Sequence, residues 1–336
     1  MLAGVETEHR PASVSVPRAA HTVVVALGGN AMTGPSGEAD QASQLRAVAV
    51  AAGAVAKLIA SGYEVVVTHG NGPQVGNILV KNELARGVVP PVSLDWCVAH
   101  TQATIGFMLM NGLEKALEGR EAGRRVATLI TRVLVDPRDP AWNDPSKPVG
   151  RYLSEEDAAA LAATGQVWKP QGRPAGSKGW RRVVPSPEPR EIVDAAPIEM
   201  LMSRGVVVVA AGGGGVPVVR GADGSLQGVE AVLDKDLTAA LLARTVGAGM
   251  LLIATDVEHA MVDFGTPRAR PIETTTPSEL RQLAAQGHFS SGSMGPKVEA
   301  VARFVEGGGH RAVITSLDRL EEGVEGRSGT VVEPAR

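Results

Sequence analysis

The chain has a single cysteine, Cys97, among its 336 residues. One cysteine cannot form an internal disulfide, and such low usage is typical of a reducing cytosol. No uninterrupted apolar run reaches the roughly 18 residues expected of a membrane-spanning helix. The first 21 residues carry charges and two prolines instead of the apolar core of a secretion signal. We therefore expect a cytoplasmic protein without a membrane partner, in which residues 1–21 form a disordered N-terminal extension.

Charge and motif absences remove further functional classes. The net charge is −3, so bulk electrostatics gives no support for nucleic-acid binding. The sequence contains no H-E-x-x-H and no cysteine pair for a zinc site, and no G-x-S-x-G for a serine hydrolase. No G-x-x-x-x-G-K-[ST] phosphate loop occurs, and the G-x-G-x-x-G dinucleotide fingerprint, read from Gly70, fails at Val75. The common nucleotide-binding explanations are therefore disfavoured.

What the chain has is a repeated junction between an apolar run and glycine. Glycines at a strand exit let the backbone approach an anion, and the following helix directs free N–H groups at it. Four glycines in a row are also hard to explain by packing, since each costs backbone entropy. A single glycine pair is equally well an ordinary turn, but three such junctions predict a phosphate site. The junctions are Gly28, Gly29 and Asn30 after the run 23–27; His69, Gly70, Asn71 and Gly72 after 64–68; and Gly212, Gly213, Gly214 and Gly215 after 206–211.

Helical and strand patterns alternate along the chain. Apolar residues recur with helical spacing over 41–61, 98–117, 235–246, 277–286 and 297–306, and strand-like runs occur at 126–135, 250–254, 312–315 and 329–333. This alternation predicts an α/β fold with a mainly parallel central sheet covered on both faces. Ligands of such sheets bind beyond the carboxyl ends of the strands, where all three glycine junctions fall.

One segment interrupts this alternation. Residues 136–189 are rich in proline, glycine and tryptophan, with a short helical stretch at 154–163. The segment is too long for a simple connection. We interpret it as an inserted subdomain, and a mobile lid is the natural role if the reaction excludes water.

Lysine is scarce, with 8 lysines against 25 arginines, so lysines in tight loops are informative. Lys147 lies in the inserted segment, whereas Lys235 and Lys297 each lie at a predicted helix start. A surface charge is the ordinary role of lysine, but compact ammonium groups also suit a phosphoryl group in transfer. Asp234 and Asp236 flank Lys235, and one of them can hold a lysine while the other approaches magnesium. The alternative for Asp234 is that it simply caps the helix that begins near Lys235.

A possible general base is His69, beside the second glycine loop, although a packed histidine at a strand end is the simpler interpretation.

Together these residues resemble carbamate kinase, of the amino acid kinase fold. Sister kinases of that fold share the glycine loops but lack the inserted subdomain with its lysine. The matching stretches are spread from Thr22 to Val332 and comprise residues 26–31, 69–77, 147–150, 180–187, 212–215, 228–236 and 292–297.

The resemblance implies a three-layer α/β/α sandwich with a protruding inserted subdomain at about 136–189. Residues 22–215 would form an N-terminal lobe for carbamoyl phosphate, and residues 216–336 a C-terminal lobe for the nucleotide. The implied reaction is phosphoryl transfer between carbamoyl phosphate and ADP, giving ATP and carbamate. The implied cofactor is Mg²⁺ carried with the nucleotide, without direct protein ligands, and the implied assembly is a homodimer.

The resemblance also implies a role for each matching site residue. Lys147 would reach the phosphate substrate from the lid, Lys235 and Lys297 would stabilise the transferred group, and Asp236 would orient these two lysines. The phosphoryl pocket would be lined by Gly28, Gly29, Asn30, Gly70, Asn71 and Gly72. The nucleotide would be bound by Gly213, Gly214, Asp234, Thr255, Asp256 and Met294.

Several positions depart from the family pattern without removing a catalytic group. Trp96, His100, Gly295 and a longer loop at 171–179 leave the substrate preference open. Two alternatives therefore remain. One is a kinase of the same fold acting on another carboxylate, such as an acylated amino acid. The other is a catalytically silent nucleotide sensor, although a sensor has no need for the loop lysines.

Overall fold

An eight-stranded sheet forms the centre of the computed structural model, which describes residues 21–33, 40–120, 123–172, 178–290 and 293–335. The predicted disordered extension therefore lies outside the described residues, apart from residue 21. Neighbouring strands are parallel except β16 and β17, so the predicted mainly parallel sheet is confirmed. The spatial order is β15 (Thr274–Thr275), β17 (Thr330–Val332), β16 (Arg311–Ser316), β12 (Met250–Thr255), β1 (Thr22–Leu27), β2 (Glu64–His69), β9 (Val207–Val209) and β3 (Val126–Thr128).

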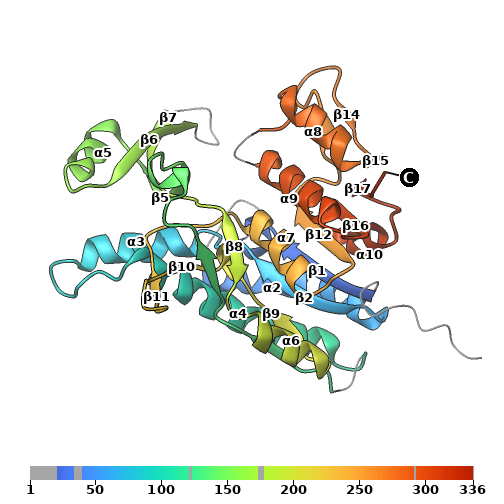
Figure 1. Cartoon of the computed structure of the whole chain (residues 1–336). Helices are drawn as coiled ribbons and strands as arrows, with labels where there is room; N and C mark the ends of the chain where they lie inside the picture. Colours follow the sequence, from blue (N-terminus) through green and yellow to red (C-terminus); the bar gives the residue numbers. More distant parts are fainter. Residues whose placement is uncertain (1–20, 34–39, 121–122, 173–177, 291–292, 336) are drawn as a thin grey trace, which may run out of the picture.

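Helices cover both faces of this sheet, as the alternation of apolar residues requires (Figure 1). Along β1, Val23 and Val25 point into one core and Val24 into the other. The result is the predicted three-layer α/β/α sandwich. One face packs against α2 (Gln41–Ala60), α4 (Leu94–Leu117) and α10 (Leu320–Val324), and the other against α6 (Ala195–Ser203), α7 (Lys235–Thr245), α8 (Pro277–Ala285) and α9 (Met294–Glu306).

Helix α2 is, by length and composition, one helix in the described part of the chain that could span a membrane. Its sequence is not an uninterrupted apolar run, because it contains the charged residues Arg46 and Lys57. Half of the apolar stretch is buried, and its buried residues pack in the core with the sheet and α4. This is the environment of a core helix.

The predicted single strand over 126–135 is wrong, because the chain changes sheets within it. Residues 126–128 form β3, whereas β4 (Arg132–Val135) joins a second sheet in the order β11 (Leu226–Gly228), β10 (Val216–Arg220), β4 and β8 (Pro189–Ile192). Thr131 marks the change. Its hydroxyl accepts from Ala211 N at 2.9 Å, and its carbonyl accepts from Val216 N at 2.8 Å. These bonds pair the buried N–H groups of Ala211 and Val216 at the point where the chain passes from one sheet to the other.

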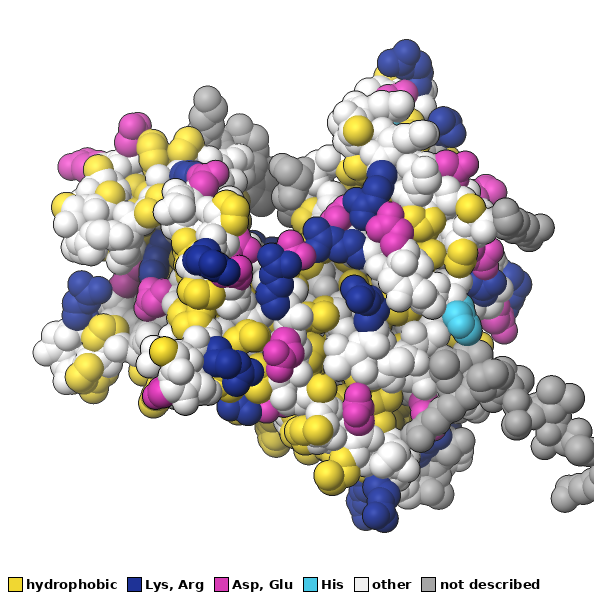
Figure 2. Space-filling model, viewed as in Figure 1, with side chains coloured by type: hydrophobic (Ala, Val, Ile, Leu, Met, Phe, Trp, Pro, Cys, Tyr) yellow, Lys and Arg dark blue, Asp and Glu magenta, His cyan; other side chains and the backbone are white. Residues whose placement is uncertain are grey.

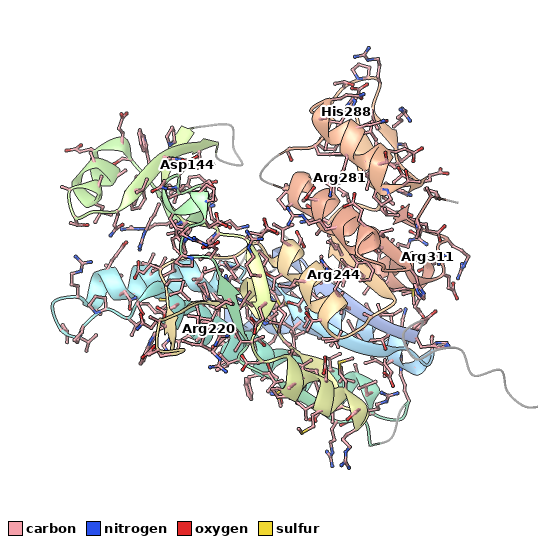
Figure 3. The ribbon with its side chains drawn as sticks, in the orientation of Figure 1. Asp144, Arg220, Arg244, Arg281, His288 and Arg311 are labelled. Carbon is pink, nitrogen blue, oxygen red and sulfur yellow. The ribbon has the colours of Figure 1, made fainter. Side chains whose placement is uncertain are left out.

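The inserted segment contains a subdomain of its own, as predicted, which protrudes from the sandwich (Figure 1). Its antiparallel sheet has the order β5 (Lys147–Leu153), β7 (Lys178–Val184) and β6 (Val167–Gly172), with α5 (Glu155–Ala162) packed on it. Below β5 lies α3 (Gln74–Ala85). The subdomain, with Asp144 at its base, and α8, which carries Arg281, stand on either side of a hollow in the surface (Figures 2 and 3).

The boundaries of most predicted helices agree closely with the structure. Helix α4 begins four residues before the predicted start, at Leu94, and α9 begins three residues early, at Met294. The proposed lobe boundary between residues 215 and 216 stays a prediction. The central sheet runs through both halves, since β1 pairs with β12, and the second sheet also crosses that boundary, since β10 pairs with β4.

Candidate active site

The three glycine junctions meet at one edge of the sheet, as predicted. Strands β1, β2 and β9 are neighbours, so their carboxyl ends lie side by side. The Gly70 N–H donates to Leu27 O at 3.1 Å, and the Gly28 N–H donates to Ala254 O at 3.1 Å. The backbone of these exits is therefore fixed by the sheet itself.

The glycines at 212–215 have a packing explanation, contrary to expectation. Gly213 has a φ of +67°, a conformation that costs other residues free energy. A Cβ atom at any of the four would come closer than 3.0 Å to a neighbouring atom. Close packing therefore requires all four glycines, whatever they bind. The neighbouring atoms are, in order, His69 Nε2, Asn71 Oδ1, Leu233 O and Val133 Cγ2.

The residue packed under this loop, His69, is 1% exposed. Burial lowers its pKa to about 4, so the ring is neutral at physiological pH. Its Nδ1 lies 2.9 Å from the Gly70 carbonyl. This environment agrees with the packed histidine and gives no support to a general base.

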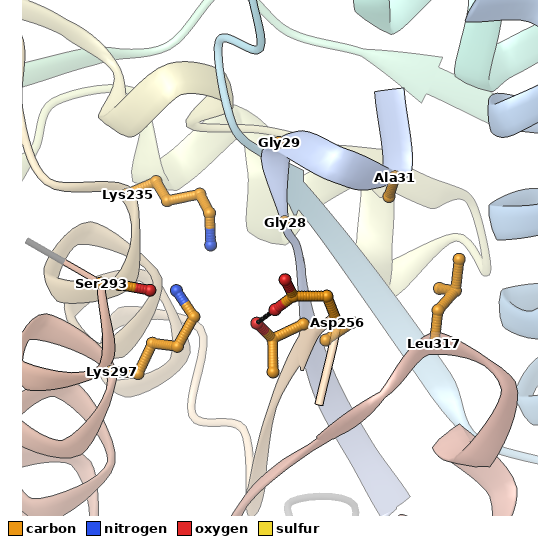
Figure 4. Close-up of a pocket in the computed structure, with 10 residues that line it drawn as sticks. Gly28, Gly29, Ala31, Lys235, Asp256, Ser293, Lys297 and Leu317 are labelled. Atoms are coloured by element: carbon orange, nitrogen blue, oxygen red, sulfur yellow. Dashed lines mark hydrogen bonds between the residues drawn. The ribbon is translucent and has the colours of Figure 1, made fainter. Parts of the chain in front are cut away.

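A buried cluster of three charges lies next to the glycine loops. Lys235 and Asp236 open α7, and Lys297 lies in the first turn of α9. Lys235 donates to Asp236 Oδ1, and Lys297 Nζ donates to Oδ2 at 3.1 Å. The exposed fractions of the side chains are only 14%, 12% and 4% for Lys235, Lys297 and Asp236. Asp236 thus holds both ammonium groups, and Figure 4 shows that Lys235 and Lys297 point into the same space.

Electrostatics makes this cluster a site for an anion. Burial alone would raise the pKa of Asp236, but the two lysines outweigh it and hold that pKa below its ordinary value. Burial lowers the pKa of Lys235, which Asp236 only partly offsets. Two lysines and one aspartate, at their formal charges, give the cluster a net charge of +1. A buried net charge of this sign favours a bound anion.

The two alternatives for Asp234 are both realised. Its Oδ1 accepts from the N–H groups of Asp236 at 2.9 Å and Leu237 at 3.2 Å, so it caps α7. Its Oδ2 accepts from Lys147 Nζ at 2.8 Å, which ties the inserted subdomain to this helix. Both aspartates therefore hold lysines, and the approach of either one to magnesium stays a prediction.

Two cavities open at this edge of the sheet. We call them the Lys297 cavity, of about 350 Å³, and the Lys147 cavity, of about 550 Å³. Gly29 and Lys235 line both and so form their common wall. The Lys297 cavity is also lined by Gly28, Thr255, Asp256, Ser293, Lys297 and Leu317 (Figure 4), and the Lys147 cavity by Gly70, Asn71, Gly72, Lys147, Arg181 and Gly213.

The predicted site residues divide between these cavities. Gly213, predicted to bind the nucleotide, lines the Lys147 cavity, and Gly214 packs on Leu233 instead. Met294 packs against the core. The side chain of Asn30 lies outside the described residues, so its predicted contact is untested.

Sequence reasoning missed several residues that line the cavities. Thr33, Arg181, Ser293 and Leu317 are among them. The clearest is Arg181, a cation in one of the stretches that resemble carbamate kinase. No spacing distinguished it from the other arginines. Only the fold of the inserted subdomain brings it to the cavity.

Magnesium has no ready set of protein ligands here. Among the residues that the structure describes, no three histidine, cysteine or acidic side chains gather as a metal site. Asp256 lines the Lys297 cavity and accepts from Thr255 Oγ1 at 3.0 Å. This donor set fits an ion held mainly by phosphate oxygens and water, the usual mode of Mg²⁺ with nucleotides.

Comparisons with known proteins identify the family. Residues 21–316 match the profile of the amino acid kinase family. The chain belongs to this family. Carbamate kinase of Pyrococcus furiosus is 44% identical over 315 residues, 93% of this chain and 99% of that protein. A carbamate kinase-like protein of Escherichia coli is 41% identical over 92% of this chain and 98% of its own.

A solved structure of this amino acid kinase family supports the same assignment. Carbamate kinase from Giardia lamblia bound to AMP-PNP aligns with a TM-score of 0.87 at 40% identity, covering 95% of this chain and 100% of that one. The predicted fold is thereby confirmed, including its inserted subdomain within the aligned length.

Proposed function

We propose that this protein is a carbamate kinase, which catalyses reversible phosphoryl transfer between carbamoyl phosphate and ADP to give ATP and carbamate. The observation that carries the proposal is the pair of cavities with a common wall at Gly29 and Lys235. Two substrates that exchange a phosphoryl group must meet at such a wall. The similarity to curated carbamate kinases over nearly the whole chain supports the same reaction.

The two cavities suggest where each substrate binds. The nucleotide phosphates enter the Lys297 cavity, and carbamoyl phosphate enters the Lys147 cavity. The transferred phosphoryl group then lies at Gly29 and Lys235. Backbone N–H groups at strand exits bind anions, and Gly29 begins the short helix η1 (Gly29–Met32) at the exit of β1.

Catalysis follows from charge and position. The phosphoryl group carries negative charge that shifts among its oxygens during in-line transfer. Lys235 and Lys297 neutralise that charge from buried positions, where electrostatic interactions are stronger than in water. Asp236 holds both ammonium groups in place before the substrates bind. Direct transfer needs no protein nucleophile, and Lys147 adds a third cation from the inserted subdomain.

Mg²⁺ accompanies the nucleotide in this proposal. It would supply positive charge that offsets the negative charge of the phosphate oxygens. Asp256 and Thr255, which line the Lys297 cavity, would hold the ion through its bound water. The proposal also includes a cytoplasmic location, which the low cysteine usage suggests, and a homodimer in arginine metabolism, which the resemblance to carbamate kinase suggests.

The decisive experiment measures ATP formation from ADP with carbamoyl phosphate, acetyl phosphate or an acyl-amino-acid phosphate. We expect carbamoyl phosphate to be the preferred donor. Preference for an acyl-amino-acid phosphate would show instead a kinase for another carboxylate, and no turnover of any donor would show a silent nucleotide sensor. The carbamate kinase-like relatives make the comparison necessary, since they are as similar as several carbamate kinases.

The same assay tests the lysines. Lys235→Met and Lys297→Met should each lower kcat by about 10²–10³, the usual loss for one group that stabilises transition-state charge. Lys115→Met, on the exposed face of α4, is the matched control and should leave turnover unchanged. Near-normal rates in either active-site variant, with the fold intact, would remove the assignment.

A further inference from the structure

Arg181 is a cation of the Lys147 cavity that no role described so far uses. It lies on β7 of the inserted subdomain and lines the same cavity as Gly29 and Lys235. The other two cations of this cavity each have a carboxylate partner, since Lys147 pairs with Asp234 and Lys235 with Asp236. Within the described part of the chain, no carboxylate pairs with Arg181.

Two contacts within the inserted subdomain hold the guanidinium group of Arg181. Its Nε donates to the Gly150 carbonyl at 3.1 Å. Its Cζ lies 5.2 Å from the ring centre of Tyr152, a cation–π distance. These contacts fix the plane of the group. They leave the two terminal nitrogens, the fork that binds planar oxyanions in a bidentate manner, without a protein partner among the described residues.

Glycine packing in turn fixes the carbonyl that holds Arg181. Gly150 has a φ of +71°, a conformation that favours glycine. Gly76, in the first turn of α3, packs directly beneath it. A Cβ atom on Gly76 would lie 2.9 Å from Gly150 Cα. Helix α3 follows the Gly70–Pro73 loop that lines the cavity, so the same helix start positions both the loop and, through Gly150, Arg181.

We propose that Arg181 binds the acyl end of the substrate, the carbonyl oxygen of carbamoyl phosphate or the carboxylate of carbamate, and that Gly76 and Gly150 position it. The inference rests on the proposed function. The phosphoryl group lies at Gly29 and Lys235, so the acyl end extends into the Lys147 cavity, which Arg181 lines. A planar carboxylate-like group matches the guanidinium fork, whereas Lys235 and Lys297 serve the phosphoryl group. Arg181 is thus a specificity residue for a small acyl phosphate.

Kinetics provides the first test. Arg181→Met should lower kcat/KM for carbamoyl phosphate about 10–100-fold, the loss expected for a hydrogen bond to a charged group. We expect most of that loss in the KM for carbamoyl phosphate and no change in the KM for ADP. Arg182→Met is the matched control, because Arg182 points to the other face of β7 and pairs with Glu230 at 3.2 Å. An equal rise in both KM values would overturn the proposal.

The positioning role has its own variant pair. Gly76→Ala should raise the KM for carbamoyl phosphate in the same selective way, because the new methyl group displaces Gly150 and with it Arg181. Gly53→Ala, in α2, has no atom within 4 Å of the added methyl group and should change neither KM. A Gly76→Ala variant with unchanged kinetics would refute the positioning role.

A binding experiment separates this inference from the proposed reaction. Phosphonoacetamide carries a carbamoyl end on a phosphonate, whereas methylphosphonate lacks that end. By titration calorimetry, the wild-type protein should bind phosphonoacetamide more tightly, and Arg181→Met should abolish the difference. Equal weakening of both ligands, or no preference in the wild type, would overturn the role of Arg181. An inactive wild type that keeps the binding difference would instead refute only carbamate kinase activity.

Discussion

Replacement of Asp236 by asparagine tests the buried charge cluster most directly. Asparagine has nearly the same shape but no charge, so Asp236→Asn leaves Lys235 and Lys297 close together without compensation. The carboxylate is 4% exposed, and water therefore cannot replace it. Removing one partner from a buried ion pair costs about 3–5 kcal/mol.

The expected change in melting temperature follows from the size of the chain. Unfolding entropy is roughly 2.1 cal/mol/K per residue. For 336 residues, 1 kcal/mol then corresponds to about 1.4 °C. Asp236→Asn should therefore lower Tm by about 4–7 °C. The control Asp144→Asn removes an ion pair in which the aspartate is 82% exposed, and its effect should stay below about 1 kcal/mol.

Tripolyphosphate makes this prediction specific to the site. The anion supplies negative charge in the Lys297 cavity and so replaces part of what Asp236→Asn removes. In differential scanning calorimetry it should therefore raise the Tm of Asp236→Asn more than that of the wild type. Equal Tm values for the two proteins, or an equal increase with tripolyphosphate, would refute the reasoning.

Three further predictions concern separate parts of the site. Lys147→Met should lower kcat/KM for carbamoyl phosphate at least tenfold. It should change the free energy of unfolding in urea by less than about 1 kcal/mol, because the ion pair between Lys147 and Asp234 is partly exposed. A large loss of stability would contradict this prediction. His69 has a folded pKa of about 4 against 6.5 when unfolded, so only the unfolded state gains its proton between these values. Stability should therefore fall by about 3 kcal/mol from this residue as the pH drops from 6.5 to 4, and His69→Gln should flatten that slope. Gly213→Ala should cost about 1–3 kcal/mol, because its φ is +67° and its methyl group meets Asn71 Oδ1; unchanged unfolding would contradict that packing.

Local patterns predict much of this fold because its central elements are regular. The runs before Gly28, Gly70 and Gly212 are continuous and buried, and parallel pairing brings their carboxyl ends together. The break within 126–135 has no such local signal. It depends on Thr131, whose partners Ala211 and Val216 are more than 70 residues away in the sequence.

The residues of the candidate site also differ in how far the local sequence predicts them. Lys235 and Lys297 could be predicted, because lysines are rare in this chain and both lie in the first turn of a helix. Asp234 could not be assigned one role, because capping and pairing with Lys147 use different oxygens of the same carboxylate. Arg181 could not be found at all, since only the antiparallel pairing of β5 with β7 brings it beside Gly150.

The strand exits at the Lys147 cavity also set a length scale, because Gly29 and Gly70 both line that cavity. Gly29 and Gly70 lie on the exits of β1 and β2, and a hydrogen bond of 3.1 Å from Gly70 N to Leu27 O joins those exits. Neighbouring strands are about 4.8 Å apart in any sheet. The separation between the loops that contain Gly29 and Gly70 is thus set by β-structure, and side-chain substitutions do not change it. Changes of substrate must therefore arise from residues farther out in that cavity, and an inhibitor that contacts both loops must fit this fixed separation.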